Sequence, residues 1–319
     1  MYKILIEIPT WLGDCIMTTP AIENILKLHP NANITIFGSV VSIKAFTYHP
    51  RVKKIVVDES RNSKFRIFKL YKQAKQLGKF DCAISFRRTF TSKLFIFFSR
   101  AILKGNYKRY TKNTTHQVIR YNDFINKIFI ADSSAGKLII YQNSKLVQLN
   151  KPDKKLLGIN PGASYGSAKR WYPEEFAKVA SELSNKYDVV IFGGPGEKDI
   201  AMDIEKSLIE KGVNNYQNIA GKATIPELID RISNLDLFIT GDSGPMHIAA
   251  AFQIPTVAIF GPTKDNETSP WMNEKSFIVK KNLDCQPCMK RTCPLLHHDC
   301  MKLINAKSVI QSIDLLNLN

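Results

Sequence analysis

The sequence predicts an α/β protein made of two doubly wound, Rossmann-like domains whose parallel sheets face a central cleft. Short apolar runs rich in β-branched residues alternate with helix-length segments along most of the chain, which is typical of parallel sheets with helices on both faces. The length of 319 residues is about twice the usual ~150 residues of one domain. With 44% apolar and 23% charged residues, the composition is that of a globular protein and excludes a disordered chain.

The first half of the chain contains four predicted strands. They are Lys3–Ile8, Asn33–Phe37, Lys54–Val57 and Asp81–Phe86. Helical patterns lie between them, for example at Asp14–Leu28 and Lys64–Leu77. No window holds the ~18 unbroken apolar residues of a membrane-spanning helix. The N-terminus lacks the apolar core of a secretory signal, so we expect a cytoplasmic protein.

The second half repeats the alternation. Its predicted strands are Lys155–Asn160, Asp188–Phe192, Leu235–Thr240 and Thr256–Phe260, and its predicted helices are Pro173–Lys186, Glu197–Lys211, Ile225–Asn234 and Gly244–Phe252. The polar stretch Asn143–Lys154 predicts a linker, which gives domains over 1–150 and 151–319. A last helix, Ala306–Leu316, is expected to pack back on the first domain.

Positive charge is concentrated in one segment. The formal net charge is +17, and residues 51–120 hold 19 Lys or Arg against three acids. One interpretation is a solvated basic surface; the other is a partner with many negative charges, such as nucleic acid, anionic lipid headgroups or a phosphorylated glycolipid. The run Leu94–Phe98 lies among these cations and fits either buried helix core or a membrane-surface contact. No RNA-binding motif accompanies the aromatic residues there.

The turn after the first strand carries a small residue followed by a carboxylate. Gly13 permits a tight turn, and Asp14 stands at the start of the next helix. One interpretation is an N-cap aspartate that accepts hydrogen bonds from free backbone N–H groups. The other is a general base at the mouth of a cleft.

Three further strand-end turns carry candidate binding residues, and the first two suit a phosphate, although the first could also be a plain surface loop. Small residues and Lys169 follow the strand that ends at Asn160, without forming a Walker A or dinucleotide fingerprint. The turn that begins at Thr240 leads into an Ala-rich helix, whose N-terminus offers free N–H donors and a partial positive charge. His247 lies in the first turn of that helix. Glu197 follows a third strand and could accept hydrogen bonds from ribose hydroxyls, or simply complement the helix dipole.

Four cysteines near the C-terminus have metal-ligand spacing. Cys285, Cys288, Cys293 and Cys300 could hold a structural zinc ion. Thiol packing or redox-sensitive thiols are the alternatives, and disulfides are disfavoured in the cytosol.

The four turns together resemble glycosyltransferase family 9. The motifs that carry the resemblance are Gly13-Asp14-x-x-x-Thr18-Thr19-Pro20, Pro161-Gly162-Ala163 with Lys169-Arg170-Trp171, Gly193-Gly194-x-x-Glu197, and Gly241-Asp242-Ser243-Gly244-Pro245-x-His247. They occur in the family's order over nearly the whole chain. The resemblance implies a GT-B fold and metal-independent, inverting transfer of heptose from ADP-heptose to the lipopolysaccharide inner core, on the cytoplasmic face of the inner membrane, with no cofactor.

The resemblance also assigns roles to residues. Asp14 matches the family's proposed catalytic base. The ADP-sugar site matches Ser164, Lys169, Glu197, Asp242, Ser243, Gly244 and His247. The acceptor, a phosphorylated Kdo-lipid A or inner-core glycolipid, would explain the basic segment. We expect its contacts from Thr10, Gly13, Arg87, Arg88 and Lys93, alongside a peripheral contact with an anionic membrane surface.

Two other functions fit parts of the sequence. A nucleotide-sugar epimerase or hydrolase would share the fold and would release free sugar when no acceptor is present. A nucleic-acid-binding protein would explain the charge but none of the four strand-end turns, so we expect no nucleic acid partner.

Overall fold

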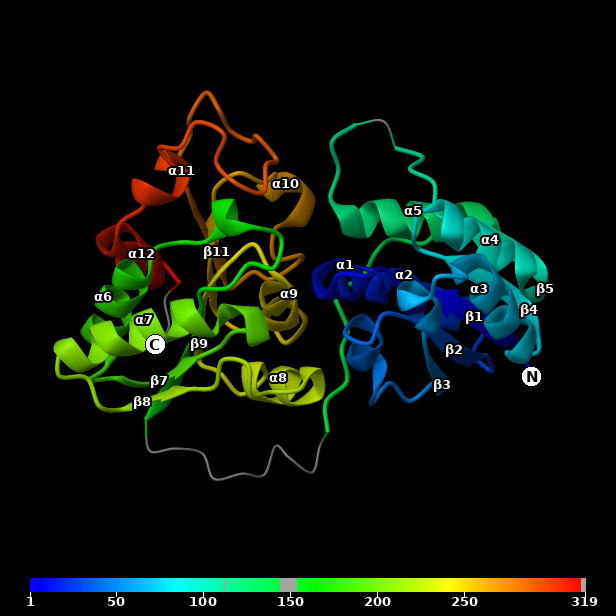
Figure 1. Cartoon of the computed structure of the whole chain (residues 1–319), viewed down its shortest axis with the longest axis horizontal. Helices are drawn as coiled ribbons and strands as arrows, with labels where there is room; N and C mark the ends of the chain where they lie inside the picture. Colours follow the sequence, from blue (N-terminus) through cyan, green and yellow to red (C-terminus); the bar gives the residue numbers. More distant parts are fainter. Residues whose placement is uncertain (112, 144–153, 317–319) are drawn as a thin grey trace. The chain divides into compact units, whose positions relative to one another are not determined.

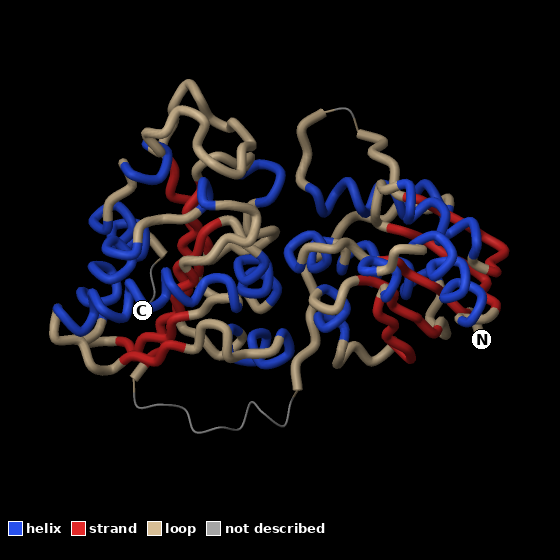
Figure 2. Tube along the Cα trace, in the orientation of Figure 1, coloured by secondary structure: helices blue, strands red, loops and turns tan. Residues whose placement is uncertain are grey.

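The chain divides into two compact units. The computed structural model describes residues 1–111, 113–143 and 154–316, and its units are Met1–Gln142 and Asn143–Asn319 (Figure 1). The predicted domain boundary at 150/151, and all of the predicted linker except its two end residues, lie outside the described residues. Each unit contains one sheet with helices packed around it (Figure 2).

The first unit is built on a five-stranded parallel sheet of order β3-β2-β1-β4-β5. Its strands are β1 (Lys3–Glu7), β2 (Asn33–Gly38), β3 (Val52–Val57), β4 (Lys79–Ser85) and β5 (Arg100–Asn106). Its helices are α1 (Leu12–Met17), α2 (Thr19–Leu28), α3 (Arg66–Gln76), α4 (Phe90–Phe98) and α5 (Gln117–Phe129), with short 3-10 turns η1 (Ser42–Phe46) and η2 (Glu59–Asn62). The four predicted strands are confirmed to within about two residues at each end.

The predicted helix Asp14–Leu28 is in fact two helices. Thr18 ends α1 and caps the start of α2. Pro20 lies in the first turn of α2 and has no N–H to continue the hydrogen-bond ladder of α1. The Thr18 hydroxyl donates to Cys15 O at 2.6 Å and the Thr19 hydroxyl to Ile16 O at 2.8 Å, which satisfies carbonyls at the end of α1.

The second unit is built on a six-stranded parallel sheet of order β11-β10-β9-β6-β7-β8. Its strands are β6 (Lys155–Asn160), β7 (Tyr187–Ile191), β8 (Tyr216–Asn218), β9 (Leu237–Gly241), β10 (Thr256–Phe260) and β11 (Ser276–Lys280). Its helices are α6 (Pro173–Leu183), α7 (Lys198–Glu210), α8 (Ile225–Ile232), α9 (Gly244–Ala251), α10 (Asp265–Thr268), α11 (Asp299–Lys302) and α12 (Ala306–Asp314), with 3-10 turns η3 (Ser167–Lys169) and η4 (Pro195–Glu197). Both β9 and β10 are buried along their whole length, as expected for a sheet covered on both faces.

The last helix packs within the second unit. Helix α12 contacts α6, β10 and β11, and the Trp171 indole N–H donates to Ile304 O at 2.9 Å just before it. Burying an aromatic ring of this size anchors the C-terminal segment to the core. A contact between this helix and the first domain stays a prediction.

The strand order locates the ligand edge of each sheet. In each unit the first strand lies inside the sheet. Strand β1 lies between β2 and β4, and β6 lies between β7 and β9. Ligands of such sheets bind beyond the carboxyl ends of the strands where the order reverses. In the second unit these are the ends of β6 and β9, which carry most of the predicted ADP-sugar residues.

Candidate active site

The loops that follow β6 and β9 are joined by an ion pair. Lys169 Nζ lies 2.5 Å from Asp242 Oδ2 and 3.3 Å from Asp242 O. Both side chains are largely buried, with 12% and 7% of their surface exposed. Thr263, in the turn after β10, donates its hydroxyl to the same Asp242 oxygen at 2.7 Å. One carboxylate therefore fixes the ammonium group at the ligand edge of the sheet, where it can meet an anion.

A second set of hydrogen bonds shapes the entry to α9. The Asn160 amide nitrogen lies 3.3 Å from Thr240 Oγ1 and 3.4 Å from Ser243 Oγ, and these two hydroxyls lie 3.1 Å apart. Ser243 is the N-cap residue of α9, and its side chain makes no cap hydrogen bond. Gly244 begins the helix, and the imidazole of His247 in its first turn is 2% exposed. Helix N-termini in general leave backbone N–H groups without intrahelical partners, which suits an anion.

Glu197 connects the turns after β6 and β7. Its carboxylate accepts from Gly194 N at 2.6 Å and lies against the backbone of Gly162. A Cβ atom on Gly162 would overlap that carboxylate, so the close approach requires glycine there. Glu197 is 9% exposed; it ends η4 and holds the N-cap position of α7, so the predicted helix start at Glu197 lies one residue before α7. Ser164, by contrast, is exposed.

The loop that carries Lys169 is fastened to the cysteine-bearing segment. The Tyr165 hydroxyl donates to Met289 O at 2.7 Å, and Ala168 N donates to Arg291 O at 3.0 Å. His298 Nε2 lies 2.9 Å from Ala168 O. The ammonium of Lys169 lies 4.8 Å from the centroid of the Tyr165 ring, a cation–π distance.

Of the three interpretations of the cysteines, the structural zinc site is not supported in the part of the chain that the structure describes. Within the described ranges, no three His, Cys, Asp or Glu side chains are arranged to hold a metal ion. Cys300 turns into the core at the start of α11 and is 7% exposed, while Cys285, Cys288 and Cys293 lie on the loop before it, partly exposed. Burial, and after it the nearby thiols of Cys285, Cys288 and Cys293, raise the pKa of Cys300 to about 11.

Asp14 lies in the first turn of α1, not at its N-cap. Trp11 holds the N-cap position without a side-chain hydrogen bond. The carboxylate is half-buried and is favoured by the positive end of the helix. Its charge, after the larger effect of burial, helps to raise the pKa values of Cys15 and Tyr121. Gly13 precedes it inside the same helix.

The carboxyl ends of β1 and β4 hold a buried ion pair. Arg87 Nη1 lies 2.8 Å from Glu7 Oε1, and Glu7 also accepts from the hydroxyls of Ser85 at 2.6 Å and Ser92 at 3.0 Å. Burial raises the pKa of Glu7, although Arg87 and both hydroxyls oppose the shift. Arg87 is thus held by a buried partner rather than presented as a solvated cation.

A neighbouring arginine reaches the loop before α1. Arg61 donates through Nη2 to the Thr10 hydroxyl at 2.8 Å and through Nε to Asp58 at 3.2 Å. Its side chain is 27% exposed. Arg88 and Lys93 are solvent-exposed at the end of β4 and on α4.

The structure adds polar residues that our sequence analysis missed. Thr263 follows a strand and Asn160 ends one, as the predicted site residues do. Their place at a strand end is the sequence signal that could have found them. Glu7 is an acidic residue inside an otherwise apolar strand, which is a signal for a buried partner. Arg61 lies in a charged 3-10 turn that resembles an ordinary surface loop.

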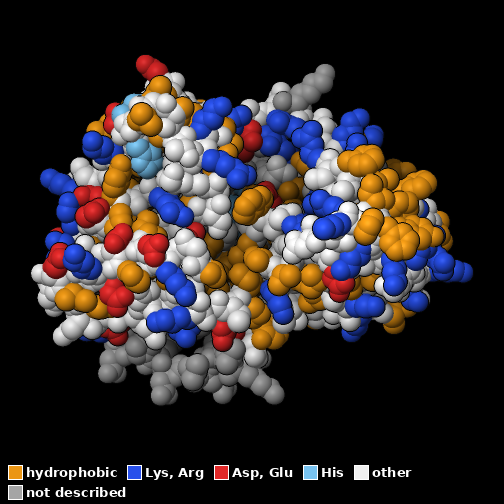
Figure 3. Space-filling model, in the orientation of Figure 1, with side chains coloured by type: hydrophobic (Ala, Val, Ile, Leu, Met, Phe, Trp, Pro, Cys, Tyr) orange, Lys and Arg blue, Asp and Glu red, His pale blue; other side chains and the backbone are white. Residues whose placement is uncertain are grey.

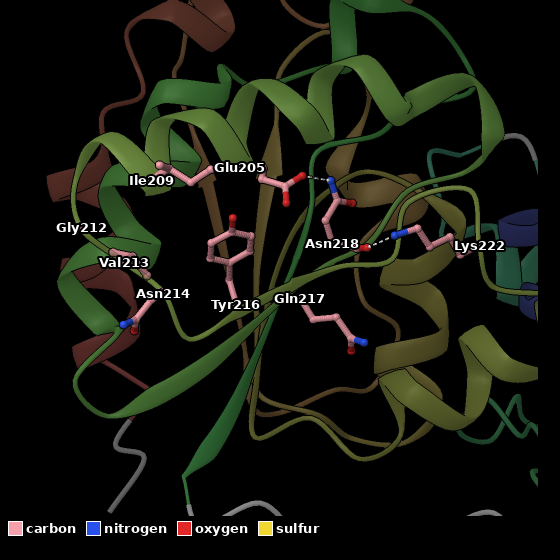
Figure 4. Close-up of a pocket in the computed structure, with 9 residues that line it drawn as sticks. All are labelled: Glu205, Ile209, Gly212, Val213, Asn214, Tyr216, Gln217, Asn218 and Lys222. Atoms are coloured by element: carbon pink, nitrogen blue, oxygen red, sulfur yellow. Dashed lines mark hydrogen bonds between the residues drawn. The ribbon is translucent and has the colours of Figure 1, made fainter.

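One pocket of the second unit lies apart from this cluster. It has a volume of about 610 Å³ beside β8 and α7 (Figure 4). Its lining includes Glu205, which accepts from Asn218 at 2.8 Å, and Lys222, which donates to Asn218 O at 2.9 Å. None of the predicted site residues lines it.

Comparison with known proteins shows the family and the fold. The sequence model of glycosyltransferase family 9 (heptosyltransferase) matches residues 78–298. Lipooligosaccharide heptosyltransferase 2 of Campylobacter jejuni serotype O:6 is 40% identical over 98% of both chains. Two solved structures share the fold. A family 9 glycosyltransferase of Veillonella parvula has a TM-score of 0.87 and 23% sequence identity, with 99% of this chain and 97% of that chain covered. ADP-heptose lps heptosyltransferase II of E. coli has a TM-score of 0.81 and 21% identity, with 99% of this chain and 98% of that chain covered.

The expected GT-B fold is therefore confirmed, and the chain is an enzyme of the expected class. With a family model that covers most of the sequence and a relative at 40% identity over almost its whole length, the chain belongs to glycosyltransferase family 9.

Proposed function

We propose that the protein transfers L-glycero-D-manno-heptose from ADP-heptose to the lipopolysaccharide inner core, adding the second heptose to the first. The relatives named heptosyltransferase 2 support this choice within the family. The observation that carries the proposal is the Lys169–Asp242 pair beside the N-terminus of α9. That arrangement provides a fixed positive group and backbone donors for a diphosphate.

In this proposal the second unit stabilises the leaving group. As the bond between the anomeric carbon and the β-phosphate oxygen breaks, its electrons go to the phosphate. Lys169 and the first N–H groups of α9 offset the growing charge, because preorganised donors act best where charge develops. Transfer would then need no metal ion. Asp242 acts through Lys169: a carboxylate in contact with the diphosphate would repel it, whereas one held by Lys169 and Thr263 keeps the ammonium in place.

Asp14 would be the catalytic base. The acceptor hydroxyl oxygen attacks the anomeric carbon while its proton passes to the Asp14 carboxylate. Attack from the side opposite to ADP is a single in-line displacement, which inverts the anomeric configuration. Closure of the two domains around the substrates would exclude water, which otherwise hydrolyses the donor.

The first unit would bind the acceptor. Arg88 and Lys93 are exposed cations suited to phosphate and carboxylate groups. Arg87, paired with Glu7, and Arg61, bonded to Thr10, would shape the site beside them. The acceptor is anchored in lipid, so the protein would work at the cytoplasmic face of the inner membrane through a peripheral contact. Among the described residues, no helix is both long and apolar enough to cross a bilayer.

Ligand-dependent thermal stability followed by a transfer assay tests the proposal. ADP should raise the unfolding temperature more than UDP, GDP or NAD, because a ligand stabilises the state that binds it. The protein should then transfer heptose from ADP-heptose to a truncated core that ends in one heptose. Release of free heptose without acceptor would favour a hydrolase or epimerase. Transfer only to a core without heptose, or only to one with two, would assign a different family 9 reaction.

A further inference from the structure

Three neighbouring elements of the first unit expose large apolar side chains. Phe68 of α3 is 68% exposed, Phe90 and Phe97 of α4 are 68% and 72% exposed, and Ile102 of β5 is 88% exposed. Phe65, Ile67 and Tyr71 add to this surface. Figure 3 shows hydrophobic side chains gathered over α3 and α4 with Lys and Arg side chains around them. Soluble monomers seldom leave a contiguous apolar patch in water without a partner for it.

Helix α4 has two apolar faces, only one of which is used by the core. Phe95 and Ile96 are buried and pack on the sheet side of the helix. Phe90 and Phe97, seven residues apart, lie on the other face and are exposed. A helix that already buries one full face needs no second one for folding. The outer phenylalanines therefore point to a contact outside the unit.

Side-chain contacts join the three elements into one surface. The Tyr71 ring of α3 meets the Phe98 ring of α4 edge-on, with centroids 5.3 Å apart. Lys104 of β5 donates to Phe97 O at 2.8 Å, and its ammonium lies 5.8 Å from the Phe97 ring centroid. The apolar and basic groups of this surface are thus held in fixed positions relative to one another. We call it the α3–α4–β5 face.

The charge of the α3–α4–β5 face has one sign. The three segments contain seven Lys or Arg residues and no Asp or Glu. Lys72, Lys93 and Lys104 are exposed among the aromatic side chains. An exposed apolar face with a basic rim is the pattern of proteins that lie on a membrane surface, since anionic headgroups attract each lysine near them.

We propose that the α3–α4–β5 face docks on an anionic lipid bilayer. Its phenylalanines and Ile102 enter the boundary between headgroups and acyl chains, while its lysines contact lipid phosphates. A bilayer offers apolar and anionic groups together over a broad, deformable surface. Single-stranded nucleic acid fits less well, because base stacking needs free aromatic faces and Lys104 lies over the Phe97 ring. Ile102, which has no aromatic ring, cannot stack on a base at all.

This inference adds to the proposed function, whose acceptor would lie in such a bilayer, but it is tested without donor or acceptor. Co-sedimentation would compare vesicles of phosphatidylcholine with vesicles that also contain phosphatidylglycerol. Two variants test the face: F68S/F90S/F97S removes apolar side chains, and K72Q/K75Q/K104Q removes cations. We expect partitioning to fall about tenfold for each phenylalanine and about fivefold for each lysine, the latter only on anionic vesicles.

Matched controls come from the second unit. K186Q/K206Q/K211Q removes the same charge from exposed positions, and M202S/I209S removes exposed apolar side chains of α7. Both should partition as the unaltered protein does. Unchanged thermal unfolding and ADP affinity would show that every variant is folded.

Several results would overturn the inference. These are equal losses in the control variants, binding that ignores phosphatidylglycerol, tighter binding to single-stranded RNA than to vesicles, or a dimer that the phenylalanine variant dissolves. Vesicle binding without any heptose transfer would remove the proposed function and leave the inference in place. Transfer to a water-soluble truncated core without vesicle binding would do the reverse.

Discussion

The two units share a scaffold and differ in the use of charge. Each has a parallel sheet with its first strand in the interior. Met1–Gln142 carries 24 Lys and Arg against 8 Asp and Glu, whereas Asn143–Asn319 carries 21 against 20. The topology fixes where a ligand binds, and the surface charge indicates which ligand is attracted. This comparison suggests a small nucleotide sugar for the second unit and a large anionic acceptor for the first.

The difference extends to single cations. Lys169 of the second unit is held by Asp242 and Thr263 at one point of the sheet edge, as a fixed diphosphate would require. Most described cations of the first unit are exposed, on strands, helices and loops, where they add to a broad field. Arg87, held against the buried Glu7, and Arg120, which is itself buried, are exceptions. A fixed charge favours specificity, and a broad field favours attraction of a large anionic partner.

Replacing Asp14 should reveal the largest difference between the roles of the two units. D14N keeps the size of the side chain but removes the base, so kcat should fall by a factor of ~10² or more. The affinity for ADP should not change, because the proposed nucleotide site is in the other unit. Steady-state kinetics and ADP titration measure the two effects. Near-normal transfer by D14N would remove Asp14 from the role of base.

Replacing Lys169 should weaken the binding of the donor nucleotide. K169Q removes a charge-assisted contact and leaves the buried Asp242 carboxylate without its cation, so ADP affinity should fall by roughly 10- to 100-fold. K178Q is the control: Lys178 pairs with Glu175, but 52% of its side chain is exposed, and such pairs contribute little. Equal ADP affinity in the two variants would show that Lys169 does not meet the diphosphate.

A single methyl group should test the contact of Glu197 with Gly162. G162A would force the Glu197 carboxylate to move, and overpacking of this kind costs about 1–3 kcal/mol of unfolding free energy. ADP-heptose affinity should fall with it. G196A, in the same loop, meets no atom within 4 Å and should be neutral. Denaturant unfolding measures the difference, and equal stability of the two variants would contradict the described loop packing.

Added salt should weaken the binding of the acceptor more than the binding of the nucleotide. Exposed charges are screened over about 8 Å at physiological ionic strength, so the KM for a phosphorylated acceptor should rise with added salt. The ADP dissociation constant should rise less, because Lys169 is largely buried. Parallel changes in both constants would mean that the basic surface of the first unit does not serve the acceptor.

The smallest effect concerns the cysteines. Burial raises the pKa of Cys82 to about 12 and of Cys300 to about 11. Because the thiolate is the reactive form, their alkylation at pH 8 should be slow and should speed up only as the pH approaches these values. The partly exposed Cys285, Cys288 and Cys293 should react first. Mass spectrometry of modified peptides measures the order, and early labelling of Cys300 would contradict its burial.

Much of the fold could be predicted because buried parallel strands are apolar throughout. Thr256–Phe260, for example, coincides with β10. The strands that we missed, β5, β8 and β11, all lie at sheet edges, where exposed residues such as Arg100 and Lys104 break the apolar run. The single helix predicted over Asp14–Leu28 was wrong, because the chain breaks it at Thr18. Pro20 in the first turn of α2 outweighs the helical pattern of apolar residues that runs through both helices.

The sequence could predict where along the chain the site residues lie, but not which side chains they contact. Strand-end turns identified Lys169, Glu197 and Asp242, and the structure joins the first and the last in one ion pair. Spacing along the chain does not reveal which side chains meet, so Thr263 and Arg61 were missed. The same reason explains the zinc prediction: the cysteine spacing suits a metal, but Cys300 packs in the core.

A crystal structure of this chain with ADP-2-deoxy-2-fluoro-heptose, a donor analogue bound in a solved E. coli heptosyltransferase, tests the central claim most directly. We predict that the diphosphate lies at the carboxyl ends of β6 and β9, in contact with Lys169 and the first N–H groups of α9, with the Asp14 carboxylate on the opposite side of the anomeric carbon. A diphosphate bound elsewhere, for instance in the pocket beside β8, or an Asp14 turned away from the sugar, would contradict it.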